Sequence, residues 1–256
     1  MNVTQIVDII RGNDGAFQQM KDKVIKEFPL TITINGQDLI TLVCSPMHLD
    51  ELVAGYLSSE RLIKDKNDIH SIKYSGNSVY LTIGHDTKSL SNKGPKIITS
   101  SSGKISGDVD IKGIHLNENI KVMYSTIYET ADILSRSSEL FKDTGGVHSA
   151  LLSDYNMDFT LFREDIGRHN AVDKIIGFMV LNNILPKHKI LLTSGRVSSE
   201  ILLKTARCGI PILVSRSAPT DLSINLANRL GITLIGFVRG KRMNIYTYER
   251  RIDMTN

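Results

Sequence analysis

Cysteine is scarce in this sequence: of its 256 residues, only Cys44 and Cys208 carry a thiol. Two lone cysteines exclude a disulfide-stapled fold and a zinc site built on cysteines. Long apolar runs are also lacking, since none approaches the ~18 residues of a membrane span. The N-terminus has Asp8, Arg11 and Asp14 where a signal peptide would need an apolar stretch. These absences predict a cytoplasmic protein that does not enter a membrane.

Familiar nucleotide and metal motifs are absent as well. The chain has no Walker loop and no GxGxxG turn, and its seven histidines never fall at metal-ligand spacing. Hydrophobic residues make up 41% and charged residues 23%, as in ordinary globular proteins with one large domain or two modest ones. The net charge of +4 is only mildly basic. An anionic ligand is therefore compatible with the composition, whereas nucleic-acid binding is not predicted.

The first half of the chain predicts a hairpin followed by a helix. Residues 30–34 alternate apolar and polar, Asn35-Gly36 suits a tight turn, and residues 40–44 return. Ser45-Pro46 reads as the N-cap and first residue of a helix. One face of that helix is expected to carry Leu49, Leu52, Val53, Tyr56, Leu57 and Ile63.

Further along, residues 69–74 and 79–83 predict short strands, and residues 88–110, rich in Ser, Gly and Lys, predict a long loop. Such loops inside compact proteins are usually functional or disordered. We expect this one to be mobile in the absence of a partner.

The second half alternates helix and strand. Helices are expected over residues 126–141 and 170–181, around Ile201 to Thr205, and from Ser217-Ala218-Pro219 onward. Strands are expected at residues 159–162, 190–193, 211–215, 232–238 and 243–248. Near-continuous apolar strands, each followed by a helix, imply a sheet covered on both faces. The predicted fold class is α/β, or α+β overall, with residues 1–118 as a smaller hairpin-and-helix domain and residues 119–256 as a three-layer domain.

Polar clusters follow the predicted strand ends, where α/β sheets bind ligands. They are residues 164–170 (EDIGRHN), 194–196 (SGR), 215–220 (SRSAPT) and 239–242 (RGKR). Glycine and serine let a ligand approach the backbone, arginine holds phosphate in two-point contact, and helix N-termini add N–H donors. Four such clusters favour an anionic, phosphate-bearing ligand. The alternative is a merely solvated rim.

Several residues in these clusters have plainer interpretations. Asp165 and Arg168, three apart at a helix start, could simply cap the helix and pair. His169 could be a satisfied, partly buried histidine. His148 follows the bend Gly145-Gly146, which favours a role in the site. The alternation along its strand points Cys44 toward the core, although its position just before a helix N-terminus could lower its pKa. Cys208 falls on the apolar face of its helix and is expected to be buried.

Five stretches of the sequence together resemble the FdhD family, the accessory proteins of formate dehydrogenase. These are GGVH at residues 145–148, EDIGRHNAVDK at 164–174, SGRVSSE at 194–200, SRSAPT at 215–220 and GFVRG at 236–240. The hairpin and the segment ELVAGYLSSE at residues 51–60 fit the same family, so the resemblance covers residues 28–246.

The resemblance implies a C-terminal domain of cytidine-deaminase-like architecture without zinc. It also implies a homodimer that binds the molybdenum cofactor in its bis(molybdopterin guanine dinucleotide) form. In that family a cysteine desulfurase passes sulfur to the protein, which sulfurates the cofactor for formate dehydrogenase. The family's cofactor-binding segment falls here on Phe237, Val238, Arg239, Gly240, Lys241 and Arg242. The strand-end clusters add Asp165, Arg168, His169, Arg196, Ser215 and Arg216 as expected cofactor-binding residues, and His148 is added from the bend at Gly145-Gly146.

One departure from the family pattern bears on the chemistry. The family carries sulfur as a persulfide on a loop with two cysteines, and here that loop reads SSSGKISG at residues 100–107. Ser102 stands in the place of the persulfide cysteine, and a hydroxyl forms no persulfide. Two functions are therefore open. One is a sulfurtransferase whose chemistry is intact only in a parent protein with cysteine at residue 102, and the other is a cofactor chaperone without sulfur chemistry. A hydrolytic deaminase relative would lack its zinc ligands.

Overall fold

The computed structural model describes residues 2–84, 96–98, 111 and 113–255. Its first sheet is built on the hairpin of β3 (Phe28–Ile34) and β4 (Gln37–Cys44). The strand order is β5-β6-β3-β4-β7, with β5 at Ile69–Ser75, β6 at Ser78–Ile83 and β7 at Lys96–Ile98. Helix α1 (Leu49–Ser59) covers one face of this sheet, where Leu52, Val53 and Leu57 join a core with the strands.

The second sheet has six strands in the order β10-β9-β11-β12-β13-β14. Its strands are β9 (His148–Asp154), β10 (Thr160–Asp165), β11 (Lys189–Thr193), β12 (Ile212–Ser215), β13 (Thr233–Arg239) and β14 (Arg242–Thr247). Strands β11, β12 and β13 are parallel, whereas β9 runs antiparallel to both β10 and β11. The fully buried inner strands explain the near-continuous apolar runs of the sequence.

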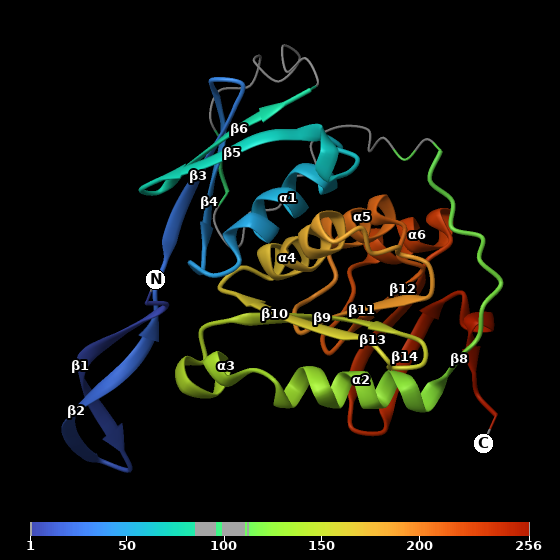
Figure 1. The fold of residues 1–256 in the computed structure, drawn as a ribbon. Coiled ribbons are helices and arrows are strands. Elements are labelled where there is room, and N and C mark those ends of the chain that lie inside the picture. The colour runs from blue at the N-terminus through green and yellow to red at the C-terminus, as the bar shows by residue number, and fades with distance from the viewer. Residues whose placement is uncertain (1, 85–95, 99–110, 112, 256) are drawn as a thin grey trace.

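Helices cover both faces of the second sheet (Figure 1). On one face lie α4 (Arg168–Leu181), α5 (Ser199–Cys208) and α6 (Asp221–Leu230). On the other lie α2 (Tyr124–Arg136) and the short α3 (Glu139–Thr144). Two further pairings are present: β8 (Val122–Met123) with β15 (Ile252–Asp253), and β1 (Thr4–Asn13) with β2 (Ala16–Ile25). The mixed α/β class is confirmed. The cytidine-deaminase-like architecture and the boundary after residue 118 stay predictions.

The predicted hairpin is confirmed, and its turn shows why Asn-Gly is there. Asn35 has φ 49° and Gly36 has φ 81°, the left-handed pair that a two-residue hairpin needs. The predicted helix start at Ser45-Pro46 is wrong, because α1 is preceded by His48 in a left-handed conformation without a side-chain cap. Ser45 is instead held by the second sheet: its N–H donates to Asp165 Oδ2 at 3.0 Å.

Some other expectations are corrected. Residues 126–141, predicted as one helix, belong to two helices, α2 and α3. Ser138 lies between them, and its Oγ accepts the Phe141 N–H, which caps the start of α3. Strand β9 was not expected at all. Within the predicted loop of residues 88–110, Lys96–Ile98 is the strand β7, paired in parallel with β4. The rest of that loop lies outside the described residues.

The two sheets are joined where α1 crosses α4. A Cβ on Gly55 would lie 1.8 Å from the carbonyl oxygen of Asp173, and a Cβ on Gly177 would lie 1.7 Å from that of Glu51. Two helix backbones therefore touch with no side chain between them. Glycine is required at both positions by this close approach.

We predict that Gly177→Ala destabilises the protein by about 1–3 kcal/mol or more, because the added methyl group has no room and the helices must separate. In an unconstrained helix the same change would stabilise by ~1 kcal/mol. Urea unfolding of the two proteins measures the difference. A stabilised Gly177→Ala variant would contradict the close crossing.

Candidate functional site

Five strand ends meet at one edge of the second sheet. In register, Asp165 at the end of β10 pairs with His148 at the start of β9, and Thr193 at the end of β11 pairs with Ser215 at the end of β12. Strand β13 runs parallel to β12 and ends at Arg239. The predicted polar clusters are thus brought to the same edge, as the strand-end rule requires.

A cleft of about 520 Å³ opens at this edge between α2, α3 and the strand ends. Its lining residues are Leu134, Ser135, Ser138, Phe141, Gly145, Gly146, Val147, His148, Ser149, Ile166, Ser194, Arg216, Ser217 and Arg239. A second hollow of about 310 Å³ shares Ser135, Arg216 and Arg239 and extends to Val238 and Gly240. We call the two together the strand-end cleft. Its size is that of an ordinary small-molecule site.

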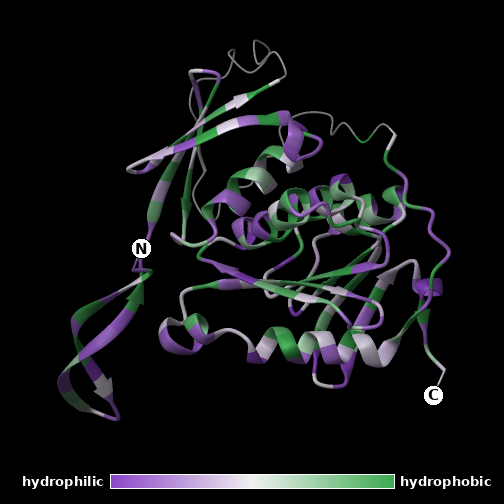
Figure 2. Ribbon diagram, in the orientation of Figure 1, coloured by the Kyte–Doolittle hydropathy of each residue, from purple (hydrophilic) through white to green (hydrophobic). Residues whose placement is uncertain are grey.

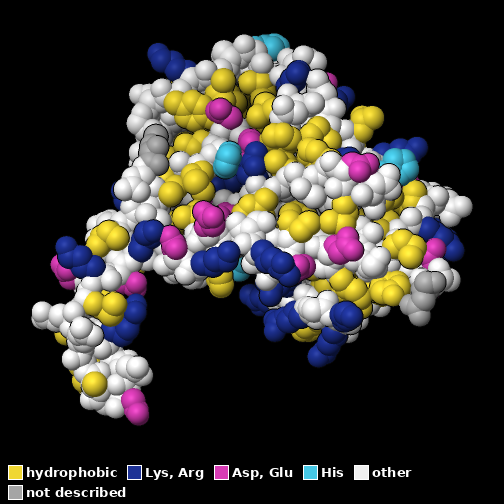
Figure 3. Space-filling model, turned by 60° about the horizontal axis from the view of Figure 1, so that its bottom comes forward, with side chains coloured by type: hydrophobic (Ala, Val, Ile, Leu, Met, Phe, Trp, Pro, Cys, Tyr) yellow, Lys and Arg dark blue, Asp and Glu magenta, His cyan; other side chains and the backbone are white. Residues whose placement is uncertain are grey.

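Two arginines stand at the junction of the two hollows. Arg216 donates from Nη1 to Ser135 Oγ on α2 at 2.9 Å, and Arg239 donates from Nε to the Arg216 carbonyl at 3.4 Å. Neither arginine has an ion-pair partner among those found in the described residues. Figure 3 shows lysine and arginine side chains gathered on the side of the body that carries α2. This part of the cleft is suited to hold an anion.

His148 lies at the opposite side of the cleft from the hairpin of β13 and β14. Its Nδ1 is 3.3 Å from Ser194 Oγ, and the same oxygen accepts the Ser149 N–H at 2.9 Å. Burial, and secondly the Arg168 guanidinium, lower the pKa of His148. The imidazole is therefore neutral at pH 7, and it can offer a hydrogen bond without adding charge.

A second polar cluster lies behind Gly195, where α4 and α5 begin. His169 Nε2 is 3.1 Å from Glu200 Oε2 and 3.4 Å from Ser198 Oγ. His169 therefore has hydrogen-bond partners inside the protein, as its plainer interpretation expected. The hydrogen bond from His169 is the main cause that lowers the pKa of Glu200.

Arg168 belongs to the same cluster and packs against Gly195, where a Cβ would lie 2.9 Å from the Arg168 Cβ. Burial, and secondly the exposed Arg196, lower the pKa of Arg168. Its Nε is buried and has no hydrogen-bond partner within the described part of the chain. The Glu200 carboxylate offsets part of the positive charge of Arg168 and Arg196, and the orphaned donor is the observation that favours a bound anion here.

The segment predicted to bind cofactor, residues 237–242, is the end of β13 and its turn into β14. Phe237 has φ 56°, and the register of the hairpin shifts between Gly236 and Arg239, so the strand bulges there. The bulge leaves Val238 fully buried in the core and Arg239, Lys241 and Arg242 exposed. Bulges of this kind re-aim side chains at the ends of strands.

Two of the predicted site residues are buried and fully used by the protein itself. Ser215 Oγ donates to the Gly195 carbonyl at 2.7 Å and accepts the Ser217 N–H at 2.9 Å. Asp165, also with no exposed surface, contacts Lys174 Nζ at 2.7 Å and accepts from Gly167 N–H and Asn170 Nδ2. Asp165 therefore pairs with Lys174 and not with Arg168.

The Asp165–Lys174 pair belongs to a network that joins the two sheets, which we call the junction network. Ser45 from the first sheet donates to Asp165, and Ile166 N–H donates to Ser45 Oγ at 3.1 Å. Asn170 Nδ2 reaches the Val43 carbonyl at 2.9 Å. On the same interface Asp173 binds Lys204 Nζ at 2.7 Å and accepts the Ser59 hydroxyl at 2.8 Å. The first sheet is thus fixed directly beside the strand-end edge.

Burial disfavours the thiolate form of both cysteines. Cys44 is fully buried, and burial, and secondly the Asp165 carboxylate, raise its pKa to about 12. Burial also raises the pKa of Cys208 to about 12. The core-facing positions predicted for both are confirmed. Ser102 lies outside the described residues.

Several cleft residues were not expected. Ser135, Leu134 and Phe141 line the cleft, and none of the three was among the predicted site residues. Phe141 is 54% exposed because the chain breaks between α2 and α3. The two serines at 137 and 138 are the one signal that could have suggested the break. Ser194 belonged to a noted cluster, but its contact with His148 depends on β9.

In residues 2–84, 96–98, 111 and 113–255, no three His, Cys, Asp or Glu side chains gather as metal ligands do. No helix in the described part is long and apolar enough to span a membrane.

Comparison with known proteins gives consistent matches along the whole chain. The model of the FdhD/NarQ family matches residues 25–253. A sulfur carrier protein FdhD from Bacillus pumilus is 43% identical, over 93% of this chain and 94% of the relative. One from Bacillus subtilis is 39% identical, over 98% of each chain. The crystal structure of a putative formate dehydrogenase accessory protein from Desulfotalea psychrophila superposes with a TM-score of 0.80 at 26% identity, covering 98% of this chain and 100% of the other. By family model, sequence identity and fold, this chain belongs to the FdhD/NarQ family.

Proposed function

We propose that this protein is a formate dehydrogenase accessory protein that binds the molybdenum cofactor, in its guanine dinucleotide form, in the strand-end cleft. The names of its relatives support an accessory role in sulfur delivery. The observation that carries the proposal is the meeting of Arg216 and Arg239 over the junction of the two hollows. The dinucleotide is cargo here, bound for hand-over to formate dehydrogenase.

The cleft residues fit a phosphate-bearing ligand. Arg216 and Arg239 would neutralise the phosphates, and Ser217 and the turn at Gly240 bring backbone groups close to them. The orphaned Nε of Arg168 marks a second place where an anion would complete a hydrogen bond. A long ligand with several phosphates uses both places. A simple metabolite with one charge would use only one.

The apolar side of the cleft fits the base of the ligand. Leu134, Phe141 and Val147 line it, and Phe141 is exposed enough to offer its ring face. Stacking of a base on an aromatic ring contributes about 1–3 kcal/mol. Neutral His148 and Ser194 remain to hydrogen-bond polar atoms of the ligand.

Sulfur carriage is a separate part of the function. We propose that the family's sulfur, supplied by a cysteine desulfurase, is carried on residue 102 when that residue is cysteine. With Ser102 the chain acts as a cofactor chaperone, which binds and delivers the dinucleotide. We further propose that the protein works in the cytoplasm as a homodimer.

We expect GDP to bind to the protein and Arg239→Ala to weaken that binding about 10–100-fold, because one charged hydrogen bond contributes about 1.5–3 kcal/mol. Isothermal titration calorimetry measures both. Arg229→Ala is the matched control, since Arg229 is an exposed arginine in the last turn of α6. The proposal fails if GDP does not bind, or if Arg239→Ala binds it as tightly as the unchanged chain.

A further inference from the structure

One wall of the strand-end cleft is formed by the short helix α3 and its two ends. Ser138, Phe141, Gly145 and Gly146 line the cleft there, and we call these four residues the α3 wall. None of the six residues of α3 is buried, and Figure 2 shows hydrophilic residues over much of this helix. A helix of this length is not stable on its own. Contacts at its two ends must therefore hold it in place.

The C-terminal end of α3 is tied to a ribbon of two strands, β1 and β2, which projects beside it (Figure 1). Lys23 Nζ on β2 lies 2.6 Å from Asp143 Oδ2, and Ile25 packs on Gly146. The Lys23 and Asp143 side chains are 42% and 48% exposed, and ion pairs with such exposure contribute little to stability. The ribbon therefore fixes the α3 wall only weakly.

The N-terminal end of α3 is tied to the second sheet by a chain of hydrogen bonds, which we call the Glu164 relay. Phe141 N–H donates to Ser138 Oγ at 3.2 Å, and the Ser138 hydroxyl donates to Glu164 Oε1 at the end of β10. The Leu140 N–H also donates to the Glu164 carboxylate. The first N–H groups of a helix have no partner within the helix. Ser138 and Glu164 supply the acceptors that α3 itself lacks.

Glu164 has no other visible task. Its side chain is nearly buried, and burial is the main cause that raises the pKa of its carboxyl. The nearby Lys174 Nζ lies 2.7 Å from Asp165 Oδ2 and donates to the backbone carbonyl of Glu164, so its contacts serve other groups. Within the described part of the chain, the hydrogen bonds to the Glu164 carboxylate come from the start of α3. A buried acid with such partners holds them in a defined place.

We propose that Glu164 is a positioning residue of the strand-end cleft: through Ser138 it holds the α3 wall, and with it the Phe141 ring, against the base of the ligand. The inference rests on the proposed function and adds what selects a ligand with a base over a bare phosphate. Arg216 and Arg239 belong to the ends of β12 and β13 and do not depend on α3. When α3 moves, the cleft therefore loses contacts with the base and keeps those with phosphate.

Calorimetric titration of the full chain with GDP and with inorganic pyrophosphate tests this separation. Glu164→Gln keeps the size of the side chain but loses one acceptor. The ratio of the GDP to the pyrophosphate dissociation constant is expected to rise about fivefold or more, because a charged hydrogen bond of the relay is lost. The ratio cancels the effect of the removed charge, which acts on both anions. A general loss of structure would weaken both ligands and leave the ratio unchanged.

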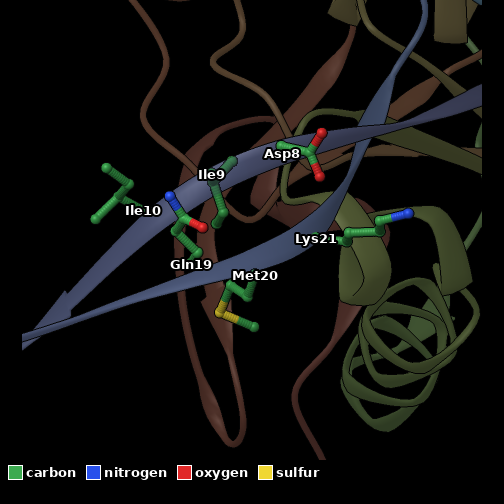
Figure 4. Close-up of a pocket in the computed structure, with 6 residues that line it drawn as sticks. All are labelled: Asp8, Ile9, Ile10, Gln19, Met20 and Lys21. Carbon is green, nitrogen blue, oxygen red and sulfur yellow. The ribbon is translucent and has the colours of Figure 1, made fainter.

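Two further variants identify the path and the background. Ser138→Ala breaks the same relay without a change of charge and is expected to raise the ratio equally, and the double variant no further, because both residues act through one contact. Asp8→Asn is the matched control, since it also replaces an acid by an amide. Asp8 is exposed and lines a separate hollow of about 540 Å³ on the ribbon (Figure 4). We expect it to leave the ratio unchanged.

Hydrogen exchange without ligand reads the relay by itself. In Glu164→Gln the amides of Leu140 and Phe141 are expected to exchange about tenfold faster, whereas those of α2 keep their rates. The inference is overturned if these two amides keep their rates, or if GDP binds and the ratio does not rise. A chain that binds pyrophosphate but no GDP would remove the proposed function and this inference together.

Discussion

Ser102→Cys is expected to accept sulfur from a cysteine desulfurase, whereas the chain with Ser102 is expected to accept none. Sulfur passes when a thiolate attacks the outer sulfur of the donor's persulfide, and the bond between the donor's two sulfurs breaks as the donor leaves as a thiolate. Serine cannot take this role. Burial raises the pKa of both remaining thiols to about 12, and Cys44 is in addition fully buried, so neither is expected to replace it.

The sequence around residue 102 favours a reactive thiolate once cysteine is present. In the sequence, Gly103 and the flanking serines add little bulk, and a lysine two residues away, Lys104, is expected to favour the ionised form of a cysteine. Radiolabelled cysteine, a desulfurase and non-reducing gels show whether the label moves. Ser137→Cys is the control, because it places an exposed thiol between α2 and α3, outside the loop of residue 102.

Each pattern of label has a definite meaning. Label on Ser102→Cys and not on Ser137→Cys supports sulfur carriage at residue 102. Label on the unchanged chain would identify another carrier, with Cys44 the first to substitute. No label on Ser102→Cys would remove sulfur carriage from the proposed function and leave the cofactor chaperone.

Lys174→Met is expected to lower the free energy of unfolding by about 3–5 kcal/mol, since it leaves the buried Asp165 carboxylate without its cation. Lys174 also donates to the carbonyls of Glu164 at 3.0 Å and Ser45 at 3.4 Å, and these bonds are lost with it. Urea unfolding with a constant m-value measures the change. Lys187→Met, on the exposed surface, should stay within about 0.5 kcal/mol.

A second variant distinguishes charge from packing at this place. Asp165→Asn combined with Lys174→Met is expected to be more stable than Lys174→Met alone, because it removes the unpaired buried charge. The amide oxygen keeps the bonds from Gly167 and Asn170, and the loss of the acceptor for the Ser45 N–H costs less than the unpaired charge. If the double variant is the less stable of the two, the loss is one of packing and the electrostatic account fails.

The sequence patterns predicted most of the alternating second sheet, because its strands and helices each carry an apolar signal of their own. Strand β9 escaped because Ser149 and Ser153 interrupt its apolar run and Gly145-Gly146 reads as a bend. Strands β1 and β2 escaped because none of their residues is fully buried, so neither strand shows a clear buried face in its sequence. In both cases the sequence of the strand lacks the clear apolar pattern from which a strand is predicted.

The site was predictable to the same extent. The strand-end rule brought Arg216 and Arg239 to one cleft, and the bend at Gly145-Gly146 pointed to His148. It could not show that Asp165 and Lys174 face inward, since a charged residue in a polar motif reads as a ligand contact until a buried partner is known. The contributions of α2 and α3 were hidden for a similar reason: helix periodicity identifies a covered face but not what covers it.

The glycine crossing of α1 and α4 also has a consequence for the newly made chain. Ser59 and Asp173, which hydrogen-bond beside it, are 114 residues apart in the sequence. During synthesis the first sheet and α1 emerge long before α4, and contacts of such separation form late. Until then the bare backbone of α1 around Gly55 is uncovered, and it is most exposed to chaperones and to other nascent chains during this interval.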